Sequence, residues 1–461
     1  MNHARVKALK GNGKTTSNKA IKSGRASLSA SLSTTPRASP MASLLTSPAH
    51  SAAPSQVGSD FSDDDDFDMA SVSDDSFGSS VEINEEGIGS FDARQLMSEL
   101  QDRKRNNVES RERLTEFFVN LLRCRYTAQT HEWLDEAATE LGELFIRSAN
   151  RGATARERML SLWAFMLTVC TSDDADVFEH GQNTLRQIIV EDDDEECKVY
   201  ALYALCVAVL YGGGSEEAAQ ETLDYLVDIV QTDGESIEAH DNGLIVAASL
   251  KAWAFVASHV DDLSATADIA MDAFVDQLDS TDIKVQSHAA ACIALIFEES
   301  RNHEEETGEP FQLPYDPQRL TGRMSELAKL SSKSVSKKHR KELREGLTNV
   351  VTSLERGVGP GYSAAGFAPD KRNRLAASDA NDDGIVEFGY RLKLRSGNNV
   401  ATIDTWSLSS RVDMLKVIFG GHLQKHIFIN PVVSECLNDA EFHQFESLKP
   451  AKHPVSKGGK R

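Results

Sequence analysis

Aromatic residues, paired cysteines and long apolar runs are all scarce in this sequence of 461 residues. Only 7% of the residues are Phe, Trp or Tyr, and Ala and Leu dominate the apolar set, which favours helices over sheets. The six cysteines show no C-x-x-C spacing, so we expect free thiols in a reducing compartment. The apolar run at 199–211 is too short to cross a bilayer, and the first thirty residues lack the apolar core of a signal peptide. We therefore expect a cytoplasmic or nuclear protein, or one found in both compartments, without a membrane partner.

Motifs for catalysis and metal binding are also missing. The thirteen histidines include no H-E-x-x-H and no His/Cys cluster at zinc spacing, and no phosphate-binding loop or nucleophile elbow occurs. His422 and His426 could share a helix face, but without a third ligand nearby we interpret them as surface histidines. The segment from Asp379 imitates the start of an EF-hand, but position twelve is Tyr390 instead of the required Glu, so we predict a polar turn. We expect no catalytic residues, no metal or other cofactor, and no small-molecule substrate.

The formal net charge of -22 is unevenly distributed. Residues 1–59 contain eight Lys or Arg and no acidic residue, whereas the segment at 60–92 is acidic around Asp63 to Asp66. The end of the chain, from Lys449, again lacks acidic residues. An acidic body with basic ends indicates that the ends meet a polyanionic partner.

The composition divides the chain into five parts. Residues 1–90 are rich in small and polar residues and predict a disordered tail, basic and then acidic. Residues 91–356 predict an armadillo-like helical repeat domain, 357–384 a linker, 385–440 a C-terminal domain and 441–461 a basic disordered tail. Helical periodicity within the repeat domain predicts a loop at 301–316 and helices at 174–190, 196–211, 216–231, 241–260, 264–279 and 282–299.

Two segments of this domain share an outline of acidic residues followed by an apolar helix. They begin near Asp193 and Thr281, about 90 residues apart, which is near twice the repeat of HEAT and armadillo proteins. We therefore predict an all-α, armadillo/HEAT-like helical repeat solenoid, followed by a small, mainly helical C-terminal domain. The alternative is an irregular all-α bundle.

The strongest functional signal is a basic helix at the end of the repeat domain. Leu343, Leu347, Val350, Val351 and Leu354 form an apolar stripe that can dock on the body. The side and back of the same helix carry the cations that we predict to contact RNA or ribosomes: Lys337, Lys338, Arg340, Lys341 and Arg344. A nuclear import signal and an ordinary solvated face are the alternative interpretations.

The C-terminal domain is predicted to start with an extended piece at 386–394, followed by helices around 406–419 and 421–437. Trp406 stands at the start of the first of these helices. It could stack on an exposed base, but at the start of an amphipathic helix a core position is favoured.

Several of these motifs resemble one family. They are the basic helix from Ser336 to Glu355, the stretch Ile403-Asp404-Thr405-Trp406, the turn from Phe419 to Gln424 with Asn430 beyond it, and the upstream run Trp163-Ala164-Phe165. With the acidic-then-apolar segment at 191–211, they are similar to the interferon-related developmental regulator family over residues 92–438. The resemblance implies an armadillo-like body and a small C-terminal domain. It also implies association with ribosomes that are not translating and, in some members, transcriptional co-regulation.

Two functions follow as expectations. The first is a non-enzymatic translational regulator that binds ribosomes and ribosomal RNA through the basic helix and the C-terminal domain. The second is a nuclear co-regulator scaffold that binds protein partners on the helical-repeat surface, with Lys337 to Lys341 serving as the import signal.

Overall fold

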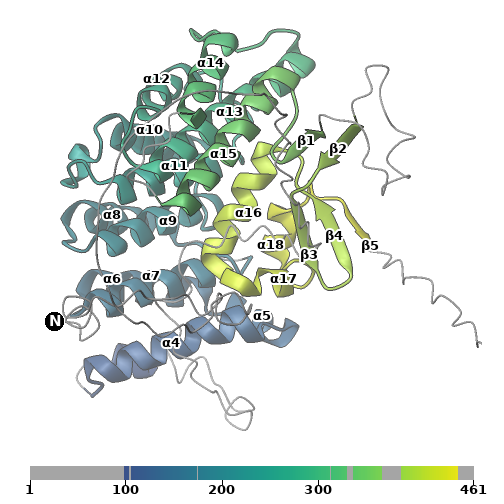
Figure 1. The fold of residues 1–461 in the computed structure, drawn as a ribbon. Helices are drawn as coiled ribbons and strands as arrows, with labels where there is room; N and C mark the ends of the chain where they lie inside the picture. The colour runs from purple at the N-terminus through teal and green to yellow at the C-terminus, as the bar shows by residue number, and fades with distance from the viewer. Residues whose placement is uncertain are drawn as a thin grey trace, which may run out of the picture. The chain divides into compact units, whose positions relative to one another are not determined.

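A computed structural model describes residues 98–102, 105–173, 175–311, 313–329, 336–365 and 386–444 (Figure 1). None of the helices in these ranges is both long enough and apolar enough to cross a membrane. The helices that precede the C-terminal part are α4 (Val108–Arg125), α5 (Ala128–Asp135), α6 (Ala138–Arg151), α7 (Ala155–Val169), α8 (Phe178–Glu191), α9 (Glu195–Tyr211), α10 (Glu216–Gln231), α11 (Gly243–Ala257), α12 (Ala267–Gln277), α13 (Ile283–Thr307), α14 (Pro317–Lys329) and α15 (Lys337–Arg356).

Side-chain caps set where these helices begin. The Thr154 hydroxyl accepts a hydrogen bond of 3.0 Å from the Glu157 amide at the start of α7. The Asp194 carboxylate accepts one of 2.9 Å from the Cys197 amide at the start of α9, and Asp282 caps α13 in the same way. Each cap satisfies an amide that has no partner within its own helix, so polar residues between apolar segments fix the helix starts.

The helices pack as antiparallel neighbours in the pairs α6/α7, α8/α9, α10/α11, α12/α13 and α14/α15. We call α6, α8, α10 and α12 the outer helices and α7, α9, α11 and α13 the inner helices. The inner helices α7, α9 and α11 are buried on almost every side, whereas α6, α8 and α10 bury one face. Each inner helix also contacts the next one along the chain, so the apolar faces of successive pairs share one core. The predicted all-α helical repeat solenoid is therefore confirmed.

The loop predicted at 301–316 is wrong in its first part. Helix α13 continues to Thr307 and ends at Gly308, whose φ of 84° suits glycine. The added turns are mostly polar and solvent-exposed. Hydrophobic periodicity cannot reveal such an extension, because it reports only the part of a helix that faces a core.

The linker predicted at 357–384 also contains a strand. Strand β1 (Tyr362–Ala365) pairs antiparallel with β2 (Val386–Tyr390). Tyr362 lies opposite Tyr390, with ring centroids 5.2 Å apart, so a partner that is distant in sequence stabilises this strand. The rest of the linker, the predicted N-terminal tail, the C-terminal tail beyond residue 444 and the start of the EF-hand-like segment lie outside the described residues.

The C-terminal part combines a small sheet with three helices. Strands β3 (Lys393–Ser396), β4 (Asn399–Thr402) and β5 (Phe442–Gln444) form an antiparallel sheet in that order. Strand β5 lies beyond residue 440, where the sequence predicts the domain to end. Helices α16 (Trp406–Phe419), α17 (Leu423–His426) and α18 (Pro431–Cys436) complete this part. Helix α16 contacts α7, α11 and α13, so the C-terminal part packs against the inner helices (Figure 1).

Candidate nucleic-acid interface

Helix α15 places the predicted cations on the surface by burying its other side. The Ser336 hydroxyl caps the helix start by accepting from the His339 amide at 3.3 Å. Leu343, Leu347 and Val350 are buried, and Val351 and Leu354 pack against the same core. The predicted apolar stripe is therefore confirmed, and it fixes which side of α15 faces solvent.

The five predicted cations differ in their surroundings. The side chains of Lys338 and Lys341 are 73% and 77% exposed, and Arg344 is also exposed. Arg340 is half-buried, and its Nε atom is buried without a hydrogen-bond partner. Lys337 begins the helix, but its side chain lies outside the described part of the structure. The structure thus exposes three of the five cations to solvent on two successive turns, and their contact with RNA stays a prediction.

Acidic neighbours partly balance this charge. The Lys338 Nζ lies 3.8 Å from a carboxylate oxygen of Glu342, and the Lys341 Nζ lies 3.5 Å from one of Glu345. Both pairs are exposed, and both place the Lys four residues before the Glu, which is the weaker order along a helix. These pairs contribute little to folding, so a phosphate can replace them at small cost.

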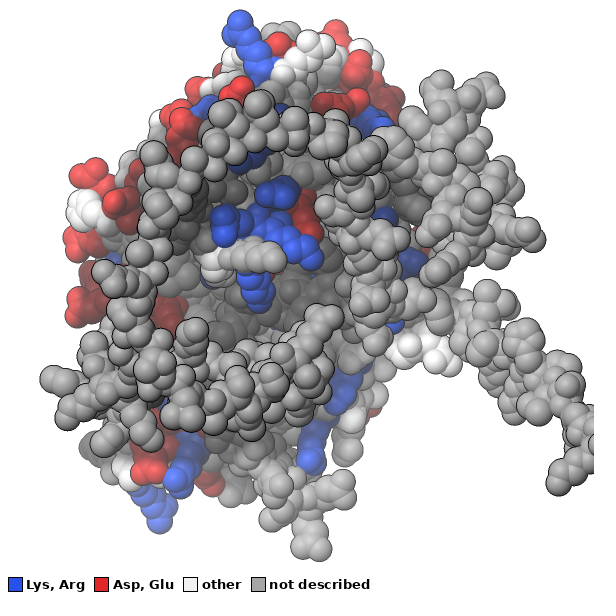
Figure 2. Space-filling model, viewed as in Figure 1, with Lys and Arg blue, Asp and Glu red and all other residues white. Residues whose placement is uncertain are grey.

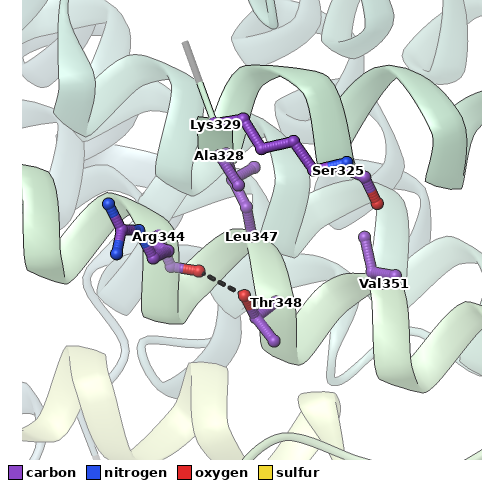
Figure 3. Close-up of a pocket in the computed structure, with 7 residues that line it drawn as sticks. All are labelled: Ser325, Ala328, Lys329, Arg344, Leu347, Thr348 and Val351. Atoms are coloured by element: carbon purple, nitrogen blue, oxygen red, sulfur yellow. Dashed lines mark hydrogen bonds between the residues drawn. The ribbon is translucent and has the colours of Figure 1, made fainter. Parts of the chain in front are cut away.

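A shallow hollow of about 490 Å³ lies between α14 and α15. Its apolar lining comes from Ala328, Leu347 and Val351 (Figure 3). The Arg344 guanidinium points away from the hollow, and the Lys329 side chain extends along α14 (Figure 3). The remaining lining residues are Ser325 and Thr348, and the Thr348 hydroxyl donates to the Arg344 carbonyl oxygen at 2.7 Å. This hollow brings together no acid, base and nucleophile that could support a reaction.

Trp406 is only 8% exposed and belongs to the core, as the sequence predicted. Its ring Nε1 donates a hydrogen bond of 3.0 Å to the Ser353 hydroxyl on α15. Its backbone amide and that of Ser407 each donate to the buried Glu298 carboxylate of α13, both at 2.9 Å. Trp406 therefore joins α16 to α13 and α15, and its ring is not available for stacking on a base.

The other end of α16 is held by the first repeats. The Trp163 indole Nε1 donates to the Ile418 carbonyl oxygen at 2.8 Å, and the Arg123 Nε donates to the Phe419 carbonyl oxygen at 3.3 Å. These carbonyls belong to the last turn of α16 and have no partner within the helix. A carboxylate at the positive end of the helix dipole and a guanidinium at the negative end both stabilise α16. Sequence reasoning missed Glu298 and Arg123 because their partners are over a hundred residues away.

His426 is not the surface residue that its spacing from His422 suggested. It is fully buried, and its Nε2 lies 3.0 Å from the Arg123 carbonyl oxygen. Burial lowers the pKa of His426 to about 4, so the ring is neutral at neutral pH. Within the described ranges, no group of three His, Cys, Asp or Glu side chains could hold a metal ion. The six cysteines are free thiols, and five of them are buried.

One known family matches most of the repeat domain and part of the acidic segment before it. The interferon-related developmental regulator (IFRD) family matches residues 61–355, which is more than half of the chain. The match ends before the C-terminal motifs that carried part of the resemblance. An uncharacterized protein of Schizosaccharomyces pombe is 25% identical over an alignment of 311 residues that covers 64% of this chain and 63% of that protein. The chain thus spans under two thirds of the length of that relative. The extent of the family match shows that this chain belongs to the interferon-related developmental regulator family.

Proposed function

We propose that this protein is a non-enzymatic regulator that binds ribosomal RNA, on ribosomes that are not translating, through α15 and the C-terminal part. The observation that carries the proposal is the exposure of Lys338, Lys341 and Arg344 on a helix whose opposite face is buried. Cations held in this way can contact phosphates without reading sequence.

The electrostatics of α15 itself favour an external anion. Its first turn contains no acidic residue, and its basic residues stand at the positive end of the helix dipole. Such an arrangement destabilises the isolated helix slightly, and a bound phosphate would remove this repulsion. The cations are therefore better suited to a partner than to the stability of the chain.

The C-terminal part offers a second exposed basic surface. On β3, Lys393 and Arg395 are exposed while the residues between and after them are buried. Arg395 pairs with Val400, and Val400 pairs with the exposed His443 on β5, whose ring lies 3.7 Å from a carboxylate oxygen of Glu441, so the cations of this face are Lys393 and Arg395. Phe428 is 53% exposed and could stack on an unpaired base. This supports a contribution of the C-terminal part to RNA binding.

Sedimentation through a sucrose gradient tests the proposal. At low salt we expect the protein in the fractions of free ribosomes and ribosomal subunits. An α15 variant with Lys338, Lys341 and Arg344 all changed to Gln should move toward the top of the gradient and depend less on salt. Wild-type protein that stays at the top at low salt would refute the proposal, and protein found only with polysomes would refute its restriction to inactive ribosomes.

A surface variant controls for the loss of charge. It removes the same number of cations from exposed positions at the start of the repeat domain and should sediment like the wild type. Its changes to Gln are at Arg105, Arg113 and Arg147.

The nuclear co-regulator scaffold remains the alternative proposal. Helix α16 covers part of the surface of α7, α11 and α13, where a solenoid often binds peptides. A protein partner of the repeats would therefore need another face, such as the acidic outer helices α10 and α12. Imaging of a tagged protein tests this alternative, which strict exclusion from the nucleus would remove.

A further inference from the structure

A second group of cations, outside α15, lies on the inner helices α11 and α13 and on α16, which packs against them. Lys251 is on α11, Lys284 is in the first turn of α13 and Lys416 is in the last turn of α16. Lys251 and Lys416 are half-buried, and Lys284 is exposed. We call these three residues the lysine group. Within the described ranges, none of the three has a carboxylate within ion-pairing distance.

The packing of three helices brings this group together. The Cys292 Sγ lies 3.3 Å from the Leu250 carbonyl oxygen, which places Lys251 beside the turn of α13 that starts at His288. The start of α11 adjoins Asp282, the residue that caps α13. Helix α16 packs against α11. At the C-terminal end of α11, the Arg411 Nε of α16 donates to the Ser258 carbonyl oxygen at 3.0 Å.

Helix α15 continues this surface. Gly346 packs against Ser287 of α13, the residue before His288. Near the other end of the helices, Gly357 lies beside Arg301, so α15 and α13 run in the same direction. The basic first turns of α15 therefore lie near the start of α13, where Lys284 stands.

The groups that face the lysine group leave an excess of positive charge. Burial lowers the pKa of Lys251, and Lys284 and Lys416 lower it further, while Asp413 opposes this effect. Burial and the nearby lysines also lower the pKa of His288 to about 3, so this ring is neutral at neutral pH. Asp413 is the carboxylate that interacts with Lys251 and Lys416, and burial raises its pKa, which weakens its negative charge further.

Charge is separated between the two sides of the repeats. Figure 2 shows Lys and Arg side chains gathered near the middle of this face, with an acidic side chain beside them, where Figure 1 shows α15 and α16. Asp and Glu side chains lie along the left edge, where Figure 1 shows α8, α10 and α12. Helices α10 and α12 contain no Lys or Arg, and their exposed charged residues are Glu216, Glu217, Glu221, Asp224, Asp228, Asp268, Asp272 and Asp276.

We propose that the lysine group is a second phosphate-binding site, which takes the phosphodiester backbone of the RNA strand that α15 contacts. This inference rests on the proposed function. Lys338 and Arg344 alone are about 9 Å apart along the axis of α15, because a helix rises 1.5 Å per residue. Together with the lysine group they form a surface longer than a single phosphate, which suits a strand with successive phosphates.

The test measures binding of a single-stranded RNA oligonucleotide to the full chain over a range of salt concentrations. The lysine-group variant has Lys251, Lys284 and Lys416 changed to Gln, which keeps the side-chain length and removes the charge. Three lost phosphate contacts should lower the slope of log affinity against log salt by about 2 and the affinity at low salt by at least about 10-fold. The surface variant serves as the matched control and should bind like the wild type.

The outcomes separate this inference from the proposed function. If the α15 variant lowers the slope and the lysine-group variant leaves it unchanged, the second site is refuted while the proposed function stands. If neither variant changes the slope, both are refuted. Inorganic phosphate that displaces the RNA at equal concentration would refute a strand as the ligand. If the lysine-group variant unfolds at a lower temperature than the wild type, the single variant Lys284→Gln is used instead, because Lys284 is exposed. It should lower the slope of log affinity against log salt by about 0.7.

Discussion

The Glu298 carboxylate links the start of α16 to the repeats. It is 7% exposed and accepts hydrogen bonds of 2.9 Å from the amides of Trp406 and Ser407. In a Glu298→Ala variant both amides lose their partner, at about 1–3 kcal/mol for each buried group. Where the carboxyl is ionised, loss of its negative charge at the positive end of the helix dipole adds to this, whereas relief from burying that charge offsets this effect. We expect a net loss of about 2 kcal/mol in the stability of the docked C-terminal part.

The pH dependence of this loss follows from the pKa of Glu298. Burial raises that pKa to about 7, and the two amide hydrogen bonds only partly oppose the rise. Between pH 4.5 and 7 the folded protein therefore binds more protons than the unfolded chain. The contribution of Glu298 to stability is complete below pH 4.5 and is lost as pH rises through 7. The difference between the wild type and Glu298→Ala should thus be larger at pH 6 than at pH 8.

Hydrogen exchange of the α16 amides in the full chain, measured at both pH values, provides the assay. In Glu298→Ala these amides should exchange faster, while those of α7 and α9 should change little. Glu304→Ala is the control, because Glu304 is an exposed acidic residue of the same helix. Equal protection of α16 in the wild type and Glu298→Ala would show that the carboxylate does not hold the helix.

Three further substitutions test the core and its polar contacts. Trp163→Phe removes the donor to the Ile418 carbonyl oxygen and should destabilise the protein by about 1–3 kcal/mol in urea unfolding. An unchanged urea concentration at the unfolding midpoint would contradict this expectation. Leu347→Ala leaves a cavity where the fully buried Leu347 side chain of α15 packs on the core, and it should lower stability by about 2–5 kcal/mol in the same assay. A smaller loss would mean that α15 does not pack on the core as described. The pKa of His426 is lowered to about 4, so between pH 4 and 6.5 the unfolded chain binds more protons than the folded protein, and stability should fall as the pH drops through this range. His426→Gln should weaken this pH dependence of stability. If the variant and the wild type depend on pH equally, His426 is not the source of the dependence.

The sequence predicts the repeat helices well where helix-ending and helix-capping residues agree with the hydrophobic periodicity. The glycines from Gly212 and the cap at Ser215 separate α9 from α10, whose bounds match the predicted segments. The apolar stripe of α15 is likewise visible, because buried residues recur every three or four positions. Local chemistry determines these features, so a local pattern is sufficient to find them.

The docking of α16 could not be predicted in the same way. Glu298 and Trp406 are separated by 108 residues, and no local sequence pattern at either residue predicts a contact with the other. Strand β1 was missed for a related reason, because its stability depends on β2 across a segment that is rich in small residues. Lys251 is the only charged residue in α11, and this isolated charge is a local sequence signal for the lysine group. A single lysine in an apolar helix has either a partner in the fold or a ligand.

The separation of charge reconciles the formal net charge of -22 with a polyanionic partner. At the ionic strength of a cell, a charge acts over about 8 Å, so a phosphate responds to nearby side chains more than to the total charge. The acidic residues of α10 and α12 stand on the outer helices, and the cations of α15 and the lysine group stand near the inner ones. The outer helices would repel RNA while the inner ones attract it, which limits the orientations in which the protein can approach. An acidic body thus reduces unspecific binding and restricts the proposed RNA contact to one face.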